Sequence, residues 1–380
     1  MNYKVLAFSV LILICVTCLF AQDTAQSKKY LKGQLHMHTN LSDGDASPID
    51  VAKEYKEMGY DFAYFTDHYQ SSDVSNIKVD GFLALPGAEW GAVLKNPYYN
   101  AIFNLHVNTL GKNRDDWGVF DLWKKHYYIH YSLAGYEEFL SEIDHDEMFN
   151  RTLSDVLTDF IEAAYKYGTI PVVNHPNWIT YGLCPFDYRE LLKVDLPYIL
   201  EIKNASDGIT EEGYKSVNSV EYTWDVLLSN GKNVFCTFDD DAHNYSKDVR
   251  DKLDKYNVPE YMVPGKTFVM VKADLNQYSI ENALRCGDFY ASTGVELEEY
   301  KVTKKSIYVK VKDKGKVNNI IFKGKMGLPL KWVTGNEAEY TFTGSPDEEY
   351  VRVKIADSDY NMALTQPVFQ NGKKIILINK

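Results

Sequence analysis

The feature that most constrains the fold is an alternation of strand and helix patterns between about residues 30 and 298. Apolar runs such as "YDFAYFTDH" and "TIPVVNHP" are typical of buried strands, and amphipathic stretches separate them. Residues 153–167, for example, place Val156, Phe160 and Ile161 on one helical face and precede Gly168. Repeated strand–helix units predict an α/β fold with parallel strands, in a closed barrel or an open sheet.

Local signals also predict where the first helix begins and ends. Ser47 is a favourable N-cap, Pro48 suits the first helical position, and Asp50 stands three residues after the cap. Gly59 then ends the apolar face of the helix. We also expect helices around residues 219–229 and before Gly287.

The pattern changes near residue 299. Ile307, Val309 and Val311 alternate with polar residues in "SIYVKVKD", and "YVRVKIAD" repeats that alternation. Turn-forming stretches separate these runs, and no helical period follows. We therefore predict a small antiparallel β-sandwich over residues 299–380, after an α/β unit over residues 22–298.

Residues 1–21 are expected to lie outside the fold. Lys4 precedes an apolar run that ends near Ala21, which is typical of a cleaved secretory signal peptide, with a membrane anchor as the alternative. A lipoprotein site at Cys15 or Cys18 is a poorer match, because bulky Ile14 precedes the first of them. These features predict a secreted protein, periplasmic or extracellular, with no stable membrane span after cleavage.

The formal net charge of −12 weighs against nucleic acid as a partner. An anionic substrate would need metal ions to hold it against such a chain. Cys184, Cys236 and Cys286 are widely spaced, so we expect small buried apolar residues rather than a disulfide framework.

Residues 111–150 fit neither the α/β pattern nor the β pattern. They are rich in tryptophan and tyrosine, and they lie between a strand and a helix. They are either a surface excursion packed on its own aromatic side chains or a lid over a site.

The stretch "HMHTNLSDG" introduces the residues that point to chemistry. His36 and His38 are two apart, so in a strand their side chains project to the same side. Asp43 follows in a glycine-containing turn. Further polar residues occur at or near the ends of apolar strands, and they are Asp67, His68, Glu89, His106, His175, Asp241 and His243.

The carboxyl ends of parallel strands share one face of an α/β molecule, so we expect these side chains to converge. Imidazoles and carboxylates without thiolates suit zinc, manganese or iron. The donors exceed what one ion can use, which predicts two or three divalent ions with Glu89 as a bridge. Such a site produces hydroxide at neutral pH and suits metal-assisted hydrolysis.

Any single histidine of this set is more often an ordinary core or surface residue. Six of the nine histidines of the chain, however, fall within strands or at their ends. The other three, His126, His130 and His145, lie in the aromatic-rich segment, and we expect no role in chemistry for them.

The order of these motifs resembles the polymerase-and-histidinol-phosphatase (PHP) family over roughly residues 33–295, through "HMHTNLSDG", "FTDH", "GAEW", "NHPNW" and "DDDAH". The resemblance implies a distorted (β/α)7 TIM-like barrel with three metal ions that serve phosphoester hydrolysis. It also implies three ligand sets, which are His36, His38, Glu89 and Asp241; Asp43, His68 and His243; and Glu89, His106 and His175.

The chain departs from a usual phosphate site because no arginine stands inside any motif. Lys203, Asn204 and Asn177 are the candidates to contact phosphate in its place. Asp67 is expected to support the ligands or to carry a proton.

These features predict a secreted metal-dependent phosphoesterase with a small phosphorylated substrate. Two alternatives remain open at this stage. One is a PHP-like hydrolase of carbamate or carboxyl esters, and the other is a non-catalytic protein that binds metal and glycan.

Overall fold

The computed structural model describes residues 29–95, 102–111, 151–178, 185–205, 213, 218–255, 262–370 and 376–377. The expected signal peptide, Cys184 and most of the aromatic-rich segment lie outside this part of the chain. None of the helices in the described ranges has the length and apolar character that crossing a membrane requires.

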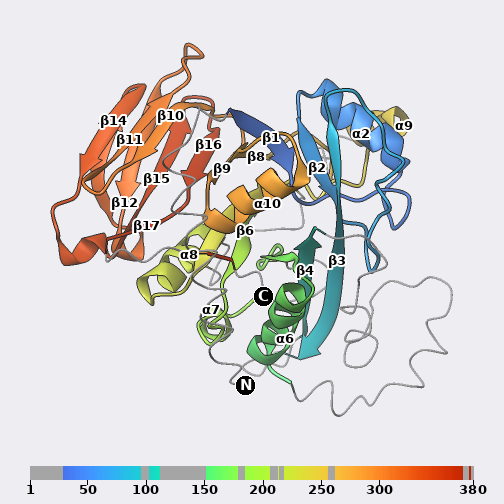
Figure 1. Cartoon of the computed structure of the whole chain (residues 1–380), viewed down its shortest axis with the longest axis horizontal. Coiled ribbons are helices and arrows are strands. Elements are labelled where there is room, and N and C mark those ends of the chain that lie inside the picture. Colours follow the sequence, from blue (N-terminus) through green and yellow to red (C-terminus); the bar gives the residue numbers. More distant parts are fainter. Residues whose placement is uncertain are drawn as a thin grey trace, which may run out of the picture.

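A long, curled sheet forms the framework of the α/β region (Figure 1). Along it the strands follow the order β8-β1-β2-β3-β4-β5-β6-β7, and β9 lies beyond β8. Their bounds are β1 (Tyr30–Gln34), β2 (Phe62–Phe65), β3 (Leu83–Lys95), β4 (Ile102–Leu110), β5 (Ile170–Val173), β6 (Tyr198–Asn204), β7 (Val234–Asp239), β8 (Phe268–Lys272) and β9 (Phe289–Ser292). Met37, just after β1, forms a parallel bridge with Ala242, just after β7, so the two distant strands meet at their carboxyl ends.

The mixed α/β fold agrees with the sequence pattern, and the expected parallel pairing holds for part of the sheet. β1, β2 and β3 are parallel, as are β5, β6 and β7. In contrast, β3 and β4 form a long antiparallel pair, β4 is antiparallel to β5, and β8 is antiparallel to β1. Only residues 96–101 join β3 to β4, which is too short for the crossover that parallel neighbours need.

Six helices flank these strands, with the bounds α2 (Pro48–Glu57), α6 (Leu153–Lys166), α7 (Tyr188–Leu191), α8 (Val220–Ser229), α9 (Lys247–Lys255) and α10 (Gln277–Cys286) in the described part of the chain. The predicted cap of α2 is confirmed, because Ser47 accepts a hydrogen bond from the Asp50 amide. Gly287 ends α10 in a left-handed conformation with φ of 76°. Two helices were not predicted from the sequence: α7, which is one turn long, and α9, in which Val249 and Leu253 are the apolar residues among charged ones.

The C-terminal region is a β domain, as predicted, and it lies at the left of Figure 1. One sheet contains β10 (Leu297–Val302), β11 (Ser306–Val311) and β14 (Glu337–Thr341). The other contains β12 (Asn318–Lys323), β13 (Pro329–Thr334), β15 (Tyr350–Asp357), β16 (Met362–Thr365) and β17 (Val368–Phe369), with short 3-10 turns η3 (Lys325–Gly327) and η4 (Pro346–Glu348). The alternating residues of β11 are buried with those of β12 and β15, among them Ile307, Val309, Phe322 and Val353.

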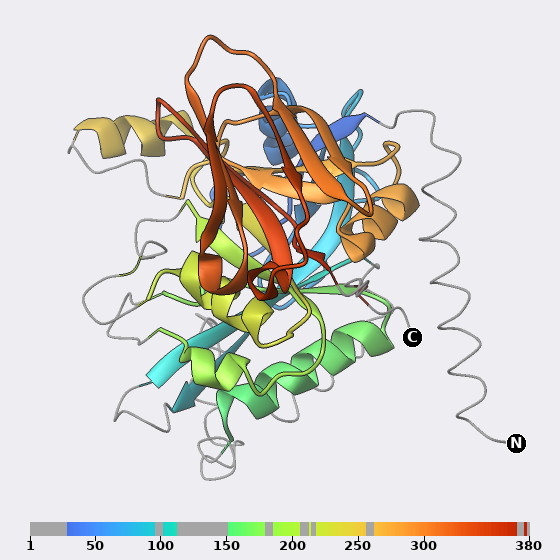
Figure 2. The same ribbon diagram turned by 90° about the vertical axis from the view of Figure 1, so that its left-hand side faces the viewer.

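The sheet of the α/β region continues into this β domain (Figure 2). β9 pairs on one side with β8 and on the other with β16. The two parts of the chain therefore share main-chain hydrogen bonds, and the boundary at residue 298 remains a prediction from the sequence.

Charged side chains hold the β domain against α8. Arg352 is fully buried and donates to both carboxylate oxygens of Asp225, with N···O distances of 2.8 and 2.7 Å, and to Glu221 at 2.7 Å. Lys323 and Lys354 also donate to Glu221, at 2.9 and 2.6 Å. Each charge in this cluster has a partner of opposite sign, which offsets the cost of removing the charges from water.

The two described cysteines differ from each other. Cys236 is a buried free thiol in β7, as expected. The expectation is wrong for Cys286, which is disulfide-bonded at the end of α10. Wide spacing in sequence does not prevent cysteines from meeting in the folded chain.

We predict that Arg352→Met lowers the free energy of unfolding by about 3–5 kcal/mol, because it removes the cation that binds both oxygens of buried Asp225 and leaves it with the more distant Lys323 Nζ, at 3.6 Å. Lys325→Met is the matched control, since Lys325 pairs with Glu349 on the surface, where both side chains are about two-fifths exposed. Its effect should stay below about 1 kcal/mol. Urea denaturation measures both, and equal midpoints for the two variants would contradict the prediction.

Candidate metal centre

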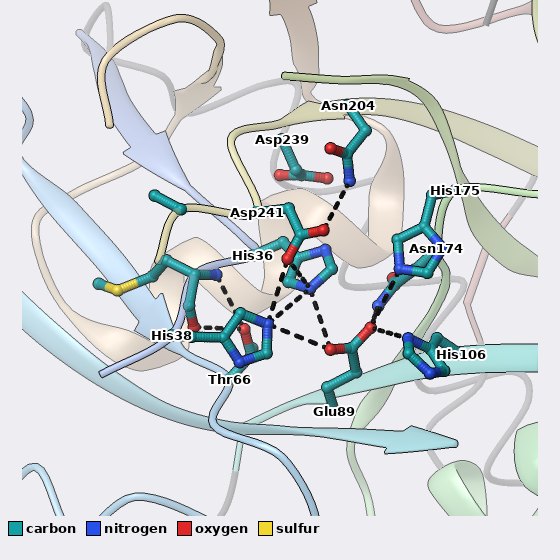
Figure 3. A network of polar contacts seen from close by, with 12 residues as sticks. His36, His38, Thr66, Glu89, His106, Asn174, His175, Asn204, Asp239 and Asp241 are labelled. Carbon is teal, nitrogen blue, oxygen red and sulfur yellow. Dashed lines mark hydrogen bonds and ion pairs between the residues drawn. The ribbon is translucent and has the colours of Figure 1, made fainter. Parts of the chain in front are cut away.

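The two histidines of the first motif project together, as predicted. β1 ends at Gln34 and the chain bends at Leu35, but it pairs again at Met37, and the His38 amide donates to the Ala242 carbonyl at 2.9 Å. The Nε2 atoms of His36 and His38 are 3.2 Å apart (Figure 3). Both rings are completely buried.

Glu89 and Asp241 complete a set of four donors around this pair. The His36 Nε2 atom is 3.3 Å from Glu89 Oε2 and 3.1 Å from Asp241 Oδ1, and the corresponding distances from His38 Nε2 are 3.1 and 3.2 Å. Four donors around a tetrahedral ion with bonds of 2.0–2.1 Å are about 3.3 Å apart. The donor spacing of this set therefore fits one divalent ion.

The carboxylate of Glu89 reaches two donor sets at once. Its Oε2 atom faces His36 and His38 and is also 3.3 Å from His68 Nδ1. Its Oε1 atom is 2.9 Å from His106 Nδ1 and 3.3 Å from His175 Nε2. This is the geometry that the expected bridging role requires.

His106 and Glu89 come from the middle of their strands and not from strand ends. Glu89 stands opposite Asn108 and Gly91 opposite His106 in the register of β3 and β4. The expectation that every candidate lies at a carboxyl end is therefore wrong for these two. The antiparallel pair runs past the site, so its middle residues, not its ends, face the other donors.

A further set of donors surrounds Asp43 at the more exposed side. Asp43 Oδ1 is 3.5 Å from His38 Nδ1 and 3.3 Å from His243 Nε2, while its Oδ2 is 3.5 Å from His68 Nε2. The side chain of Asp43 is 44% exposed, whereas that of Glu89 is 1% exposed. The centre thus runs from a buried carboxylate to one that solvent reaches.

Asp241 and His243 both enter the centre from the chain just after β7, with His243 Nδ1 3.8 Å from Asp241 Oδ1. β7 ends at Asp239, and Asp241 adopts a left-handed conformation with φ of 48°, which breaks the strand alternation. Asp241 joins His36 and His38, whereas His243 joins Asp43. His175 also has positive φ, at 24°. Such conformations cost about 1–3 kcal/mol each and cluster at functional sites.

The nine candidate ligands thus form three overlapping groups, whose donor atoms lie within 4.8 Å of one another in each group. These groups are His36, His38, Glu89 and Asp241; His38, Asp43, His68 and His243; and Glu89, His106 and His175. Nitrogen and oxygen donors without sulfur fit zinc, manganese or iron. Ligation itself remains a proposal.

The electrostatics of the centre favour bound cations. Burial opposes charge on Glu89, yet the surrounding imidazoles, His106 and His36 foremost, hold its pKa well below the usual value. Burial would lower the pKa of His38, but Asp241 and Glu89 raise it to about 10. Burial instead lowers the pKa of His106 to about 4, so this ring stays neutral beside Glu89, as a metal ligand must be.

Asp67 does not point at the donors but supports the turn that carries them. Its carboxylate accepts hydrogen bonds from the Thr39 amide at 2.7 Å, from the Thr39 hydroxyl, from Ser42 Oγ at 3.0 Å and from Ser72 Oγ. Asp67 is fully buried. These contacts tie the turn that carries Asp43 to the end of β2.

Of the three candidates for phosphate contact, Asn204 lies against the ligands. Its Nδ2 atom donates to Asp241 Oδ2 at 3.2 Å and to Glu201 Oε1 at 2.7 Å. A register shift between Glu201 and Lys203 in the β6–β7 pairing accompanies this placement. Asn177 donates instead to the Asn218 carbonyl. Lys203 is half-buried, and a role for it in phosphate contact remains a prediction.

Two residues that were not predicted from the sequence, Glu201 and Asn174, orient the candidate ligands, and Asp239 is buried nearby. Glu201 accepts from the His175 amide at 2.8 Å and lies 3.6 Å from His36 Nδ1. Asn174 Nδ2 donates to Glu89 Oε1 at 2.8 Å. Burial, together with the charge of Glu201, raises the pKa of Asp239. Asp239 Oδ1 accepts a hydrogen bond from the Leu35 amide, just after β1, at 3.3 Å. An acid inside an apolar strand, as in "YILEIKN", is the signal that could have revealed Glu201.

Neither a protein-family model nor a curated protein matches this sequence. Among solved structures, a two-domain protein from Bacteroides vulgatus, described as containing a predicted PHP-like metal-dependent phosphoesterase, is 14% identical with a TM-score of 0.39, over 88% of this chain and 92% of that one. A provisionally assigned metal-dependent phosphoesterase from Bifidobacterium adolescentis is 14% identical, with a TM-score of 0.36, over 59% and 96% of the two chains.

An amidohydrolase from Chromobacterium violaceum is also 14% identical, with a TM-score of 0.38, over 57% of this chain and 89% of that one. Because all three TM-scores are below 0.5, we base the functional argument on the residues of this chain. The solved structures to which this chain is similar are PHP-like metal-dependent phosphoesterases and an amidohydrolase.

Proposed function

We propose that this chain is a secreted PHP-like metal-dependent hydrolase that cleaves a phosphoric ester of a small-molecule substrate. Two or three divalent ions would be held by the three donor groups around Glu89. The single observation that carries the proposal is Glu89 itself, whose two buried oxygens face two different donor sets.

Ions at such a site supply Lewis-acid polarisation and lower the pKa of water towards neutrality. Sites with two or more ions are suited to phosphoryl transfer, because charge develops on several oxygens in the transition state. This chain carries a net charge of −12, so cations at the centre would also offset its repulsion of an anionic substrate.

The protein's own part in the reaction is to hold the ligands in place. Glu201 orients His36 and His175 from the side away from Glu89, through the contacts described above. Asp67 holds the turn that carries Asp43, since both of its oxygens accept hydrogen bonds. Substituting groups that orient metal ligands typically costs about 10–100-fold in metal affinity or activity.

We predict that Glu89→Gln lowers bound metal to at most one ion per chain and reduces turnover at least about 100-fold, because it removes the charge shared by two donor sets. Elemental analysis and steady-state kinetics on the purified chain measure both effects. Glu190→Gln is the matched control, since Glu190 is equally buried but accepts hydrogen bonds from Ser154 on α6 and from Lys193 just after α7. Full metal content in Glu89→Gln would contradict the bridging role.

We expect the metal-loaded chain to hydrolyse an aryl phosphate or an aryl phosphodiester in preference to an aryl carbamate. His175→Ala should reduce that activity together with metal content, because His175 Nε2 faces Glu89 Oε1. Parallel assays of the three substrates at equal concentration test the reaction class. Turnover of the carbamate alone would overturn the phosphoesterase proposal, as would His175→Ala with full metal content and full turnover.

A further inference from the structure

Tyr69 follows His68 at the edge of the metal centre. Its amide donates to the carbonyl of Glu89 at 2.8 Å, so its main chain is fixed to β3 next to the bridging carboxylate. Its ring stacks on that of His68, with centroids 5.4 Å apart and planes 25° from parallel. The phenol ring of Tyr69 therefore lies beside His68, one of the candidate ligands.

Gly91 shows where the hydroxyl of Tyr69 lies. A Cβ atom added to Gly91 would be 2.8 Å from the Tyr69 hydroxyl, 3.0 Å from His106 Cδ2 and 3.1 Å from His106 Nε2. The hydroxyl and the His106 ring thus meet above Gly91, a residue of β3 that has no side chain. A larger residue at position 91 would push one or both of them away.

The backbone of Tyr69 is strained, with φ of 56°. Positive φ is costly for an aromatic residue, and such strain persists where the surrounding structure holds it. Here the bond to Glu89 and the stacking on His68 hold it. The strained backbone, the ring contact and the glycine opposite all direct one phenol to the space beside His68 and His106.

We propose that Tyr69 is a catalytic residue whose hydroxyl donates a hydrogen bond to an oxygen of the substrate's ester group. This assignment rests on the proposed function and adds to it a polar contact that no metal ligand supplies. A phenol is a neutral donor near pH 7, so it can contact a phosphoryl or ester oxygen without adding charge to the centre.

The test compares Tyr69→Phe with wild type in the metal-loaded full chain. Removing one hydrogen bond to a charged oxygen should weaken binding of inorganic phosphate, measured by titration calorimetry, about tenfold. kcat/KM for an aryl phosphate should fall by about tenfold or more, whereas metal content should not change. Tyr69→Gly, which left-handed backbone favours, should show the same loss.

Tyr360→Phe is the matched control. Tyr360 also has a left-handed backbone, with φ of 67°, but it is 92% exposed in the β domain. This variant should match wild type in phosphate affinity and turnover. Equal losses in the two Tyr→Phe variants would overturn the proposal.

Phosphate affinity separates this proposal from the proposed function. If wild type binds phosphate but cleaves none of the esters, the proposed function fails while Tyr69→Phe still tests the contact. If wild type cleaves esters and Tyr69→Phe equals it in both phosphate affinity and kcat/KM, only the Tyr69 proposal fails. Absence of phosphate binding by metal-loaded wild type would also overturn the Tyr69 proposal.

Discussion

The centre of this molecule depends on one buried carboxylate. Glu89 is 1% exposed, and an ionised carboxyl group in such surroundings needs positive charge or hydrogen-bond donors close by. Five imidazoles, from His36, His38, His68, His106 and His175, together with the amide of Asn174, supply that environment. The strands around Glu89 bring these six groups together around its two oxygens.

The sheet meets that requirement with two kinds of strand. Parallel strands deliver His36, His38, His68 and His175 from just beyond their carboxyl ends, where polar groups reach the surface of an α/β fold. The antiparallel pair of β3 and β4 instead crosses the site and presents Glu89 and His106 from its middle. The left-handed backbone of Asp241 turns the chain after β7, and Asp241 and His243 then belong to different donor groups.

Much of the fold and most of the candidate site could be predicted from the sequence, because apolar periodicity locates strands and helices and places polar residues at their ends. The caps of α2 and α10 and the alternation of Ile307 and Val309 in β11 are local patterns, and the structure contains them. The pairing of β3 with β4 depends on how the chain reverses, and apolar runs look alike in parallel and antiparallel sheets. Glu201 was missed because its partners, His36 and the His175 amide, are distant in sequence and only the folded sheet brings them together.

The continuous pairing of β8, β9 and β16 joins the C-terminal β domain to the main sheet. A chain shortened before β10 would keep every candidate ligand yet expose one whole side of β9, with open amides and carbonyls that invite another chain to add a strand. Asp225 and Glu221 of α8 would also lose their ion pairs with Arg352. The last eighty or so residues therefore cover the edge of β9, which another chain could otherwise join, although they contribute none of the candidate ligands.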